Sequence, residues 1–388
     1  MGLKVNGSNA LRILVLSKRQ YMNRDLLDDR YGRMRELPLE LARRGHRVRG
    51  FCLSYATRPE GSIWDGPVRW ESINATKALI PGLARFVLRA ERLARQVDLI
   101  WAGSDAIYGV IAWLLGKRVG AATIFDLYDN FGCFLTGRLP LFRQLFQHAL
   151  RQCDGVTCNG EALARLIRSK GRSKPIQVIP TVGRTDLFRP LDKYDCRKRF
   201  GLPLEGRIAG IAGAIDRNRG IELVFDAFER LKSQIPDLSL ALAGPVGKAI
   251  SVPADSRIRY LGMLPFEQVP LFVNALDVAL IPNIDSAFGR YCFPQKAWEI
   301  MTCDVPLIAA DVEGMKLFFK NHPEWLYDPA DAQDLARALK RRLEDRTTGY
   351  GTAPTWSDAA AQVERLLLEL WAQRPGASPK QRDWIKAK

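Results

Sequence analysis

The sequence predicts an α/β protein built from two Rossmann-like, doubly wound domains that face each other across a cleft. Three observations support this fold class. The chain has 388 residues, more than one compact core usually holds. Short apolar runs alternate with helical patterns, as expected for parallel strands covered by helices on both faces of a sheet. This alternation starts afresh near residue 206, which indicates a second unit of the same kind.

The first domain is expected to span residues 1–181. A helix is predicted over residues 33–46, and Gly45 marks its end. Functional residues are expected where the strands of such a sheet end, because ligands bind outside the carboxyl ends of parallel strands. Strands are predicted at the apolar runs 11–17 (LRILVLS), 47–55, 98–103, 121–129, 155–160 and 176–182.

The second domain is expected to span residues 182–355, with the boundary between residues 181 and 190. Its first strand is predicted at 206–214 (GRIAGIAGA) and is followed by a helix over 221–236. Further strands are predicted at 238–245, 258–263, 278–283 and 305–311. A closing helix over 356–373 is expected to pack back on the N-terminal domain, and residues 374–388 are expected to form a basic, flexible tail.

The composition is that of an ordinary globular protein, with 47% hydrophobic and 26% charged residues. The apolar run near the start is too short for a secretory signal, and no apolar stretch reaches the length of a membrane span. The seven cysteines show no CxxC spacing, so neither a zinc site nor a disulfide framework is indicated. A cytoplasmic protein is the simplest interpretation.

The net charge of +16 predicts an anionic partner. Residues 82–96 place four arginines about one helical turn apart, namely Arg85, Arg89, Arg92 and Arg95. This helix is either a solvated basic surface or a docking surface for an anionic membrane, which would place the protein on the inner face of that membrane. Nucleic acid is not expected as a partner, because the basic residues are spread over many helices and no nucleic-acid-binding module is present.

Lys296 and Glu299 lie three residues apart in a helical pattern that is otherwise largely apolar, directly before a predicted strand. Two interpretations are open. The residues form a simple helix pair, which would contribute about 0.2–0.5 kcal/mol, or they belong to a binding site. A dehydrogenase is excluded, because no G-x-G-x-x-G follows the first strand.

Six stretches follow one another in series along the chain, namely YGRMRELPLELARRGHRV, QVIPTVGRTDLFRP, GIAGAIDRNRGIELVFDAFERL, LSLALAGP, IRYLGMLPFEQVPLFVNALDVALIP and FPQKAWEIMTCDVPLIAADVEG. Together they resemble the glycosyltransferases of family 4, which have the GT-B fold. The resemblance covers residues 11–373 and is densest from 176 to 314. It implies metal-independent transfer of a sugar, with retention of configuration, from a nucleotide-sugar donor to an acceptor, and no cofactor.

The same resemblance implies that the donor lies mostly on the C-terminal domain. Arg219, in DRNRG, matches a basic residue that contacts the pyrophosphate, and Lys296 is a second candidate. Glu299 matches the final glutamate of the family's Glu-x7-Glu signature, which holds the ribose hydroxyls. The position of the first glutamate is occupied by Tyr291, a departure that puts the identity of the sugar in doubt.

Glycines complete the implied donor site. Gly213 and Gly220 would let the backbone approach the phosphates, although each also suits an ordinary turn. Gly262 and Leu264 lie where the family stacks and reads the nucleobase.

The acceptor is implied to bind the N-terminal domain. Asp126 or Asp129, at the end of a predicted strand, is a candidate general base or acceptor-positioning residue, and Asp129 or Asn130 is equally suited to cap the next helix. Arg33 and Arg35 are candidates for an acceptor phosphate, or are surface charges of a helix. None of the three histidines is placed as a catalyst, so the leaving phosphate itself is expected to accept the acceptor's proton.

The sequence therefore predicts a glycosyltransferase acting on a lipid-linked or saccharide acceptor, in polysaccharide or glycolipid biosynthesis. Two alternatives are a sugar-nucleotide epimerase or other enzyme of the same fold, which would consume the donor without an acceptor, and a non-enzymatic nucleic-acid binder.

Overall fold

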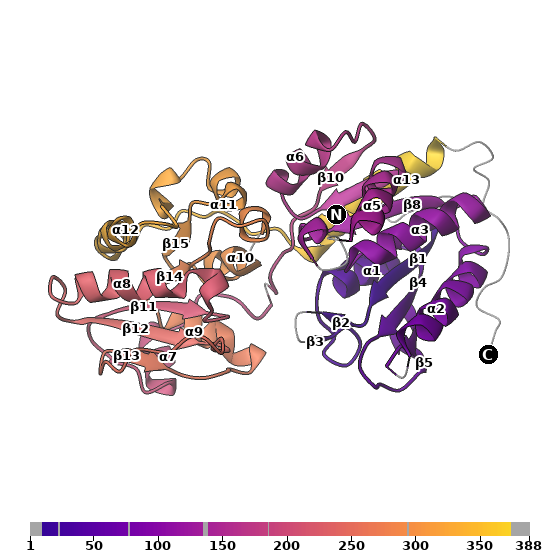
Figure 1. Ribbon diagram of the computed structural model, residues 1–388. Helices are drawn as coiled ribbons and strands as arrows, with labels where there is room; N and C mark the ends of the chain where they lie inside the picture. The colour runs from indigo at the N-terminus through magenta and orange to yellow at the C-terminus, as the bar shows by residue number, and fades with distance from the viewer. Residues whose placement is uncertain are drawn as a thin grey trace. The chain divides into compact units, whose positions relative to one another are not determined.

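The computed structural model describes residues 10–21, 24–76, 78–134, 139–184, 186–292 and 295–373. Figure 1 traces its helices and strands. The chain divides into two compact units, Met1–Pro180 with Trp356–Lys388, and Thr181–Thr355. The chain thus enters the second unit after Pro180 and returns to the first at Trp356. The predicted tail, 374–388, lies outside the described residues.

The first unit is built on a sheet in the order β10-β9-β8-β7-β1-β4-β6-β5. Its strands are parallel, except that β5 pairs antiparallel with β6. The central strands are buried on both faces, as their apolar sequences predict. The strands are β1 (Arg12–Lys18), β4 (Arg47–Ser54), β5 (Gly61–Asp65), β6 (Val68–Asn74), β7 (Leu99–Ala102), β8 (Ala122–Leu127), β9 (Gly155–Cys158) and β10 (Ile176–Val178), with a separate hairpin of β2 (Gln20–Tyr21) and β3 (Arg24–Asp25).

Helices cover both faces of this sheet. Helix α3 packs against α2 and α5 on one side, and α13 packs against α1. Asp105 caps the start of α3, and Gly120, at φ 72°, ends it in the left-handed conformation. The helices are α1 (Arg33–Arg43), α2 (Leu79–Ala94), α3 (Ala106–Val119), α5 (Pro140–Gln152), α6 (Glu161–Ser169) and α13 (Trp356–Ala372), with a 3-10 turn η2 (Phe131–Cys133).

The second unit has a parallel sheet in the order β13-β12-β11-β14-β15-β16. Its own buried apolar core lies between this sheet and the surrounding helices. The strands are β11 (Arg207–Ala212), β12 (Leu238–Ala243), β13 (Ile258–Tyr260), β14 (Val278–Ile281), β15 (Leu307–Ala310) and β16 (Leu326–Tyr327).

Figure 1 shows α8 and α12 on one side of this sheet and α9 on the other, as expected for a doubly wound unit. The two units confirm the predicted pair of doubly wound α/β domains. The helices are α7 (Lys193–Arg199), α8 (Ile221–Leu231), α9 (Val269–Asn274), α10 (Gln295–Thr302), α11 (Glu313–Phe318) and α12 (Ala332–Glu344), with 3-10 turns η3 (Arg217–Arg219), η4 (Phe266–Gln268), η5 (Gly289–Tyr291) and η6 (Pro323–Trp325).

The last helix, α13, belongs to the first unit although it follows the second in sequence. Glu364 on α13 pairs with Arg44 at a distance of 2.5 Å and lies 3.0 Å from Nε2 of His46. The N–H of Leu11 donates to Nδ1 of the same imidazole, so Nε2 carries the proton and donates to Glu364. These bonds attach α13 to the segment between α1 and β4.

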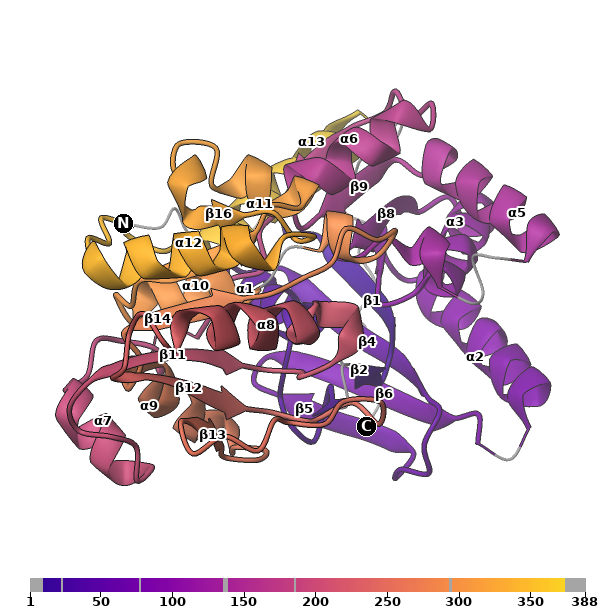
Figure 2. The same ribbon diagram turned by 60° about the vertical axis from the view of Figure 1, so that its left-hand side comes forward.

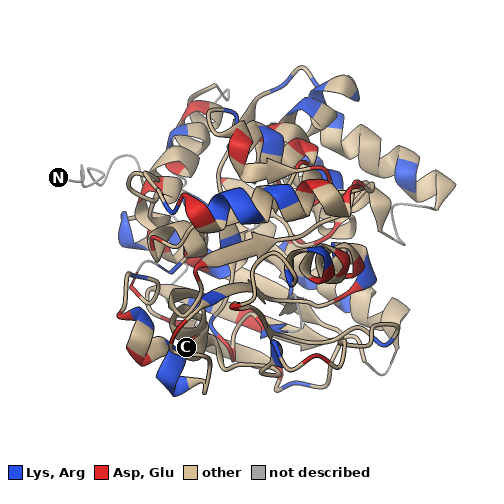
Figure 3. Cartoon of the chain, turned by 90° about the vertical axis from the view of Figure 1, so that its left-hand side faces the viewer, with Lys and Arg blue, Asp and Glu red and all other residues tan. Residues whose placement is uncertain are grey.

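Charged residues are distributed over many elements. Figure 3 shows lysines and arginines interspersed with aspartates and glutamates along the helices on the face that it presents. A helix long and apolar enough to cross a bilayer is absent from the described part of the chain.

Candidate functional site

The loop that follows β11 brings Gly213 against Lys296 of α10. The N–H of Gly213 donates to the carbonyl oxygen of Ala243, and its φ of 142° is one that only glycine adopts readily. A methyl group at this position would lie 1.6 Å from Nζ of Lys296. The absence of a side chain at Gly213 is therefore what allows the Lys296 ammonium to reach the end of β11.

Arg219 approaches the same place from the short turn η3. The side chain of Asp216 accepts from the N–H of Asn218, and Gly220, at φ 70°, ends the turn and starts α8. The half-buried Arg219 guanidinium lies 5.2 Å from the ring centre of Phe288, and its Nη1 lies 3.8 Å from Sγ of Cys292. The aromatic face and the thiol hold this cation in position.

The two cations affect each other. Burial, followed by repulsion from Arg219, lowers the pKa of Lys296 to about 8, although Glu299 acts in the opposite direction. Within the described residues, Lys296 forms no ion pair. Two neighbouring cations without a matching anion form a site that an anionic ligand would stabilise.

Glu299 lies one turn further along α10 and is only 8% exposed. It accepts a hydrogen bond of 2.9 Å from Nε2 of Gln295, and the backbone of Gly183 packs against its side chain. No ion pair joins it to Lys296 among the described residues, so the simple helix-pair interpretation does not describe this geometry. A buried carboxylate beside a close backbone is suited to accept from a pair of ligand hydroxyls.

A series of backbone contacts extends from Gly213 across the carboxyl edge of the sheet. The N–H of Gly244 donates to the carbonyl oxygen of Gly262 at 2.8 Å, and the hydroxyl of Tyr260 donates to the carbonyl oxygen of Gly244. Gly262 has a φ of 72° and open space where a side chain would lie. Leu264, two residues on, packs partly buried against the core.

Tyr291 ends η5 and is followed by Cys292, the thiol that meets Arg219. The backbone of Gly314 packs closely on the carbonyl oxygen of Cys292. The predicted donor residues therefore all lie in the second unit, in loops and helix starts that follow its parallel strands.

In the first unit, Arg33 and Asp126 are bonded to each other. Both side chains are fully buried and form a bidentate pair with a shortest distance of 2.8 Å. Asp126 also accepts from Thr157, and Arg33 donates to the carbonyl oxygen of Ile179. In this structure both side chains are committed to protein partners, so the geometry does not favour the predictions that Arg33 meets an acceptor phosphate and that Asp126 serves as a general base.

Among the described residues, Arg35 and Asp129, unlike Arg33 and Asp126, do not pair with each other. Arg35 pairs with Asp65 at 2.6 Å and with Glu36, so most of its charge is compensated. Asp129 is half-buried at the end of β8, and Asn130 precedes the turn η2 without a side-chain capping bond. Asp129 stays a prediction as an acceptor-positioning residue.

Each of the three histidines packs against, or bonds to, other side chains of the protein. His46 is 4% exposed and holds α13, as described above. His148 packs edge-on to Trp113, and His322 stacks on Trp325 with ring centres 3.9 Å apart.

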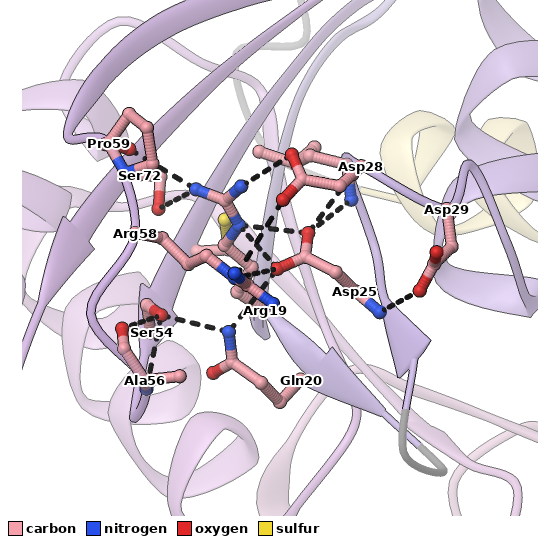
Figure 4. Close-up of polar contacts among 12 residues, drawn as sticks. Arg19, Gln20, Asp25, Asp28, Asp29, Ser54, Ala56, Arg58, Pro59 and Ser72 are labelled. Carbon is pink, nitrogen blue, oxygen red and sulfur yellow. Dashed lines mark hydrogen bonds and ion pairs between the residues drawn. The ribbon is translucent and has the colours of Figure 1, made fainter.

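The sequence interpretation missed a polar network at the carboxyl ends of β1, β4 and β6, shown in Figure 4. Arg19 is 4% exposed and bonds Asp25, Asp28 and the hydroxyl of Ser72. Burial would raise the pKa of Asp25, but hydrogen bonds from Arg19 and two backbone N–H groups lower it. The dense run of charges directly after the first strand was the available signal for this network.

Two family models match the chain. One, described as glycosyl transferases group 1, matches residues 192–363, and the other, described as a glycosyl transferase 4-like domain, matches residues 33–181. The chain is 28% identical over 219 residues to the 2-deoxystreptamine glucosyltransferase of Streptomyces kanamyceticus, covering 53% of this chain and 55% of that protein. It is 26% identical over 412 residues to the D-inositol 3-phosphate glycosyltransferase of Mycobacterium leprae, covering 89% of this chain and 92% of that protein.

Solved structures agree on the fold. Sucrose-phosphate synthase from Thermosynechococcus elongatus matches with a TM-score of 0.68 and 21% identity, covering 92% of this chain and 94% of that chain. Anabaena HepE in complex with UDP matches with a TM-score of 0.66 and 17% identity, covering 93% of this chain and 97% of that chain. At these identities the likeness shows the fold alone.

Proposed function

We propose that this chain is a group 1 glycosyltransferase, since two glycosyl transferase family models match its residues 33–181 and 192–363. In this proposal it transfers a sugar from a nucleotide-sugar donor to an acceptor hydroxyl with retention of configuration. The observation that carries the proposal is the cluster of Arg219, Lys296 and Gly213 at the carboxyl edge of the second sheet. The similar structure of Anabaena HepE is a complex with UDP, which also favours a nucleoside-diphosphate donor.

The roles of the donor-site residues follow from the negative charge that develops on the pyrophosphate during transfer. The bond between the anomeric carbon and the β-phosphate oxygen breaks, and the pyrophosphate keeps the electron pair. Arg219 and Lys296 then stabilise the growing negative charge in the position that a metal ion occupies in other enzymes. The acceptor oxygen bonds to the anomeric carbon on the same face, and its proton passes to the departing phosphate oxygen.

The remaining donor residues have binding roles in this proposal. Glu299 accepts hydrogen bonds from the ribose hydroxyls. The backbone at Gly213 and Gly220 approaches the phosphates, and the segment from Gly262 to Leu264 lies against the nucleobase. Tyr291 replaces a carboxylate that related enzymes direct at the donor sugar, so backbone groups near η5 take over that contact.

The acceptor is proposed to be polyhydroxylated, either a saccharide or a lipid-linked saccharide of polysaccharide or glycolipid biosynthesis. The two relatives compared above are named for ring polyols, 2-deoxystreptamine and D-inositol 3-phosphate. A lipid-linked acceptor would bring the enzyme to the cytoplasmic face of a membrane.

The test is a thermal-shift screen of nucleotide sugars, followed by a transfer assay with the donor that stabilises the protein. Lys296→Ala should abolish transfer while the fold is retained, whereas Lys340→Ala, which removes an exposed lysine of α12, should leave transfer intact. Near wild-type turnover in Lys296→Ala would refute the donor-site assignment. Consumption of the donor without any acceptor would favour an epimerase instead.

A further inference from the structure

A pocket of about 640 Å³ lies in the first unit, between α2 and the strands β5 and β6. Arg85, Arg89 and Arg92 of α2 form one wall, and Glu60 and Glu71 contribute to the other. This pocket shares no residue with the candidate donor site, which belongs to the second unit.

The carboxylates of the pocket are already engaged. Glu71 accepts from Arg89 at 2.8 Å and, through its other oxygen, from Arg49 behind it. Glu60 accepts from Arg85 at 3.0 Å. One carboxylate thus serves two guanidinium groups, and this leaves an excess of positive charge.

Arg92 adds to this excess, because it is exposed and forms no ion pair with the described part of the chain. Burial, and then repulsion from Arg69 and Arg89, lowers the pKa of Arg49 to about 10. Arg49 still carries its charge at neutral pH and is bonded to Glu71 from behind the pocket wall, so it adds to the positive charge around the pocket.

We propose that this pocket binds a phosphate group. Three guanidinium groups on one helix offer the planar, paired donors that match phosphate oxygens. The walls also carry apolar side chains, including Ile73 and the 63% exposed Leu88, so the ligand that bears the phosphate has room for a non-polar part. A soluble phosphate ester and the headgroup of a phospholipid share this chemistry.

The experiment uses the full chain carrying Arg219→Ala and Lys296→Ala, which removes the proposed donor site as a competing anion site. Inorganic pyrophosphate is titrated by calorimetry at low salt. Adding Arg89→Gln and Arg92→Gln should weaken binding at least about tenfold, since a charge-assisted hydrogen bond is worth roughly 1.5–3 kcal/mol. The single change Arg92→Gln, which breaks no ion pair, should weaken it in the same direction.

Arg168→Gln is the matched control. Arg168 lies on α6 of the same unit, is 50% exposed and pairs with Glu161 at 3.0 Å, much as Arg85 pairs with Glu60. Its replacement should not change pyrophosphate binding. Thermal unfolding checks that each variant is folded.

A second arm measures binding to vesicles of phosphatidylglycerol, with pyrophosphate as competitor. If pyrophosphate competes with vesicle binding in the parent protein but not in the Arg89→Gln, Arg92→Gln protein, the pocket binds phosphate from either source. If vesicle binding requires Arg89 and Arg92 but pyrophosphate does not bind, the ligand of the pocket is the lipid headgroup. If neither probe binds, or if the pocket variants bind as the control does, the proposal is overturned.

Discussion

Lys296 combines burial with a neighbouring cation, and together these determine how its charge responds to pH. Its pKa is lowered to about 8, so the ammonium form is lost as the pH rises through that value. In the proposed donor site, the charged form of Lys296 is the one that binds a nucleoside diphosphate. We therefore expect the affinity for UDP to be constant below pH 8 and to fall above it, by up to about tenfold per pH unit.

Calorimetric titration of UDP on both sides of pH 8 measures this effect. Lys296→Ala should bind UDP weakly and without the same step. An affinity that is flat through this range in the wild type would mean that Lys296 does not contact the diphosphate.

Arg219 is expected to act on the pyrophosphate rather than on the nucleoside. Arg219→Ala should therefore weaken UDP binding by about tenfold or more, since a charge-assisted hydrogen bond is lost, and should leave uridine binding nearly unchanged. Arg217→Ala is the control, because Arg217 lies in the same turn but is exposed and paired with Glu222 at 2.9 Å. An equal loss for UDP and uridine would indicate a structural role for Arg219.

At the residue scale, a local sequence pattern could show which residues lie close together, but it could not show contacts between residues far apart in sequence. Lys296 and Glu299 lie on one short helix, and the loop glycine Gly213 was named for its lack of a side chain. Arg33 and Asp126 are 93 positions apart, and their complete burial against each other arises from the packing of α1 on the sheet. Nothing in either local sequence indicates that pairing.

At the scale of whole elements, helix α13 returns to the first unit and is bonded there by Glu364. Its carboxylate is 6% exposed and takes hydrogen bonds from both Arg44 and His46. Burial lowers the pKa of His46 despite this partner, so the imidazole stays neutral near pH 7. The bond between Leu11 and His46 ties the start of β1 to the same cluster.

Glu364→Gln should lower the free energy of unfolding by about 2 kcal/mol, because it leaves the Arg44 guanidinium facing a neutral amide in a largely buried position. Denaturant unfolding monitored by circular dichroism measures the change. Glu369→Gln, on the exposed side of the same helix, should have almost no effect. Equal stability of the two variants would show that the Glu364 cluster does not hold α13.

The strands and helices were predictable to different degrees. Central parallel strands such as β1 and β11 are short apolar runs, and both overlap the predicted ranges to within two residues at each end. The β5–β6 hairpin was not predicted, because β5 is an exposed edge strand with no apolar run to mark it. That hairpin forms part of the pocket for which phosphate binding is proposed, so this pocket could not be predicted from the sequence either.

At the scale of the whole molecule, the charge of +16 is only partly available to a membrane. On α2, Arg85 pairs with Glu60 and Arg89 pairs with Glu71, while Arg95 pairs with Glu91. Exposed ion pairs contribute only about 0–1 kcal/mol, so an anionic surface competes with them at little cost. The basic helix therefore stays a possible docking element, but a weaker one than its composition alone predicts.

Two apolar side chains on α2 and on the nearby helix α5 are highly exposed. Helix α3 packs against both α2 and α5, and Figures 1 and 2 show these three helices adjacent to one another. Ile80 on α2 is 81% exposed and Leu141 on α5 is 83% exposed. Arginines and projecting apolar side chains on neighbouring helices are the combination found on proteins that bind the surface of a bilayer.

We therefore predict that the protein floats with phosphatidylglycerol vesicles at low salt and less with neutral vesicles. Replacing Arg85, Arg89, Arg92 and Arg95 by glutamine should remove most of the binding at low salt, because each basic residue near such a surface contributes about 1 kcal/mol and salt screens that contribution. Replacing Ile80 and Leu141 by serine should instead reduce the binding that persists at high salt, because apolar burial is not screened. Pyrophosphate binding to the phosphate pocket should survive this second change, since neither residue lines it. If flotation does not occur, or is indifferent to both sets of changes, the three helices form only a solvated surface.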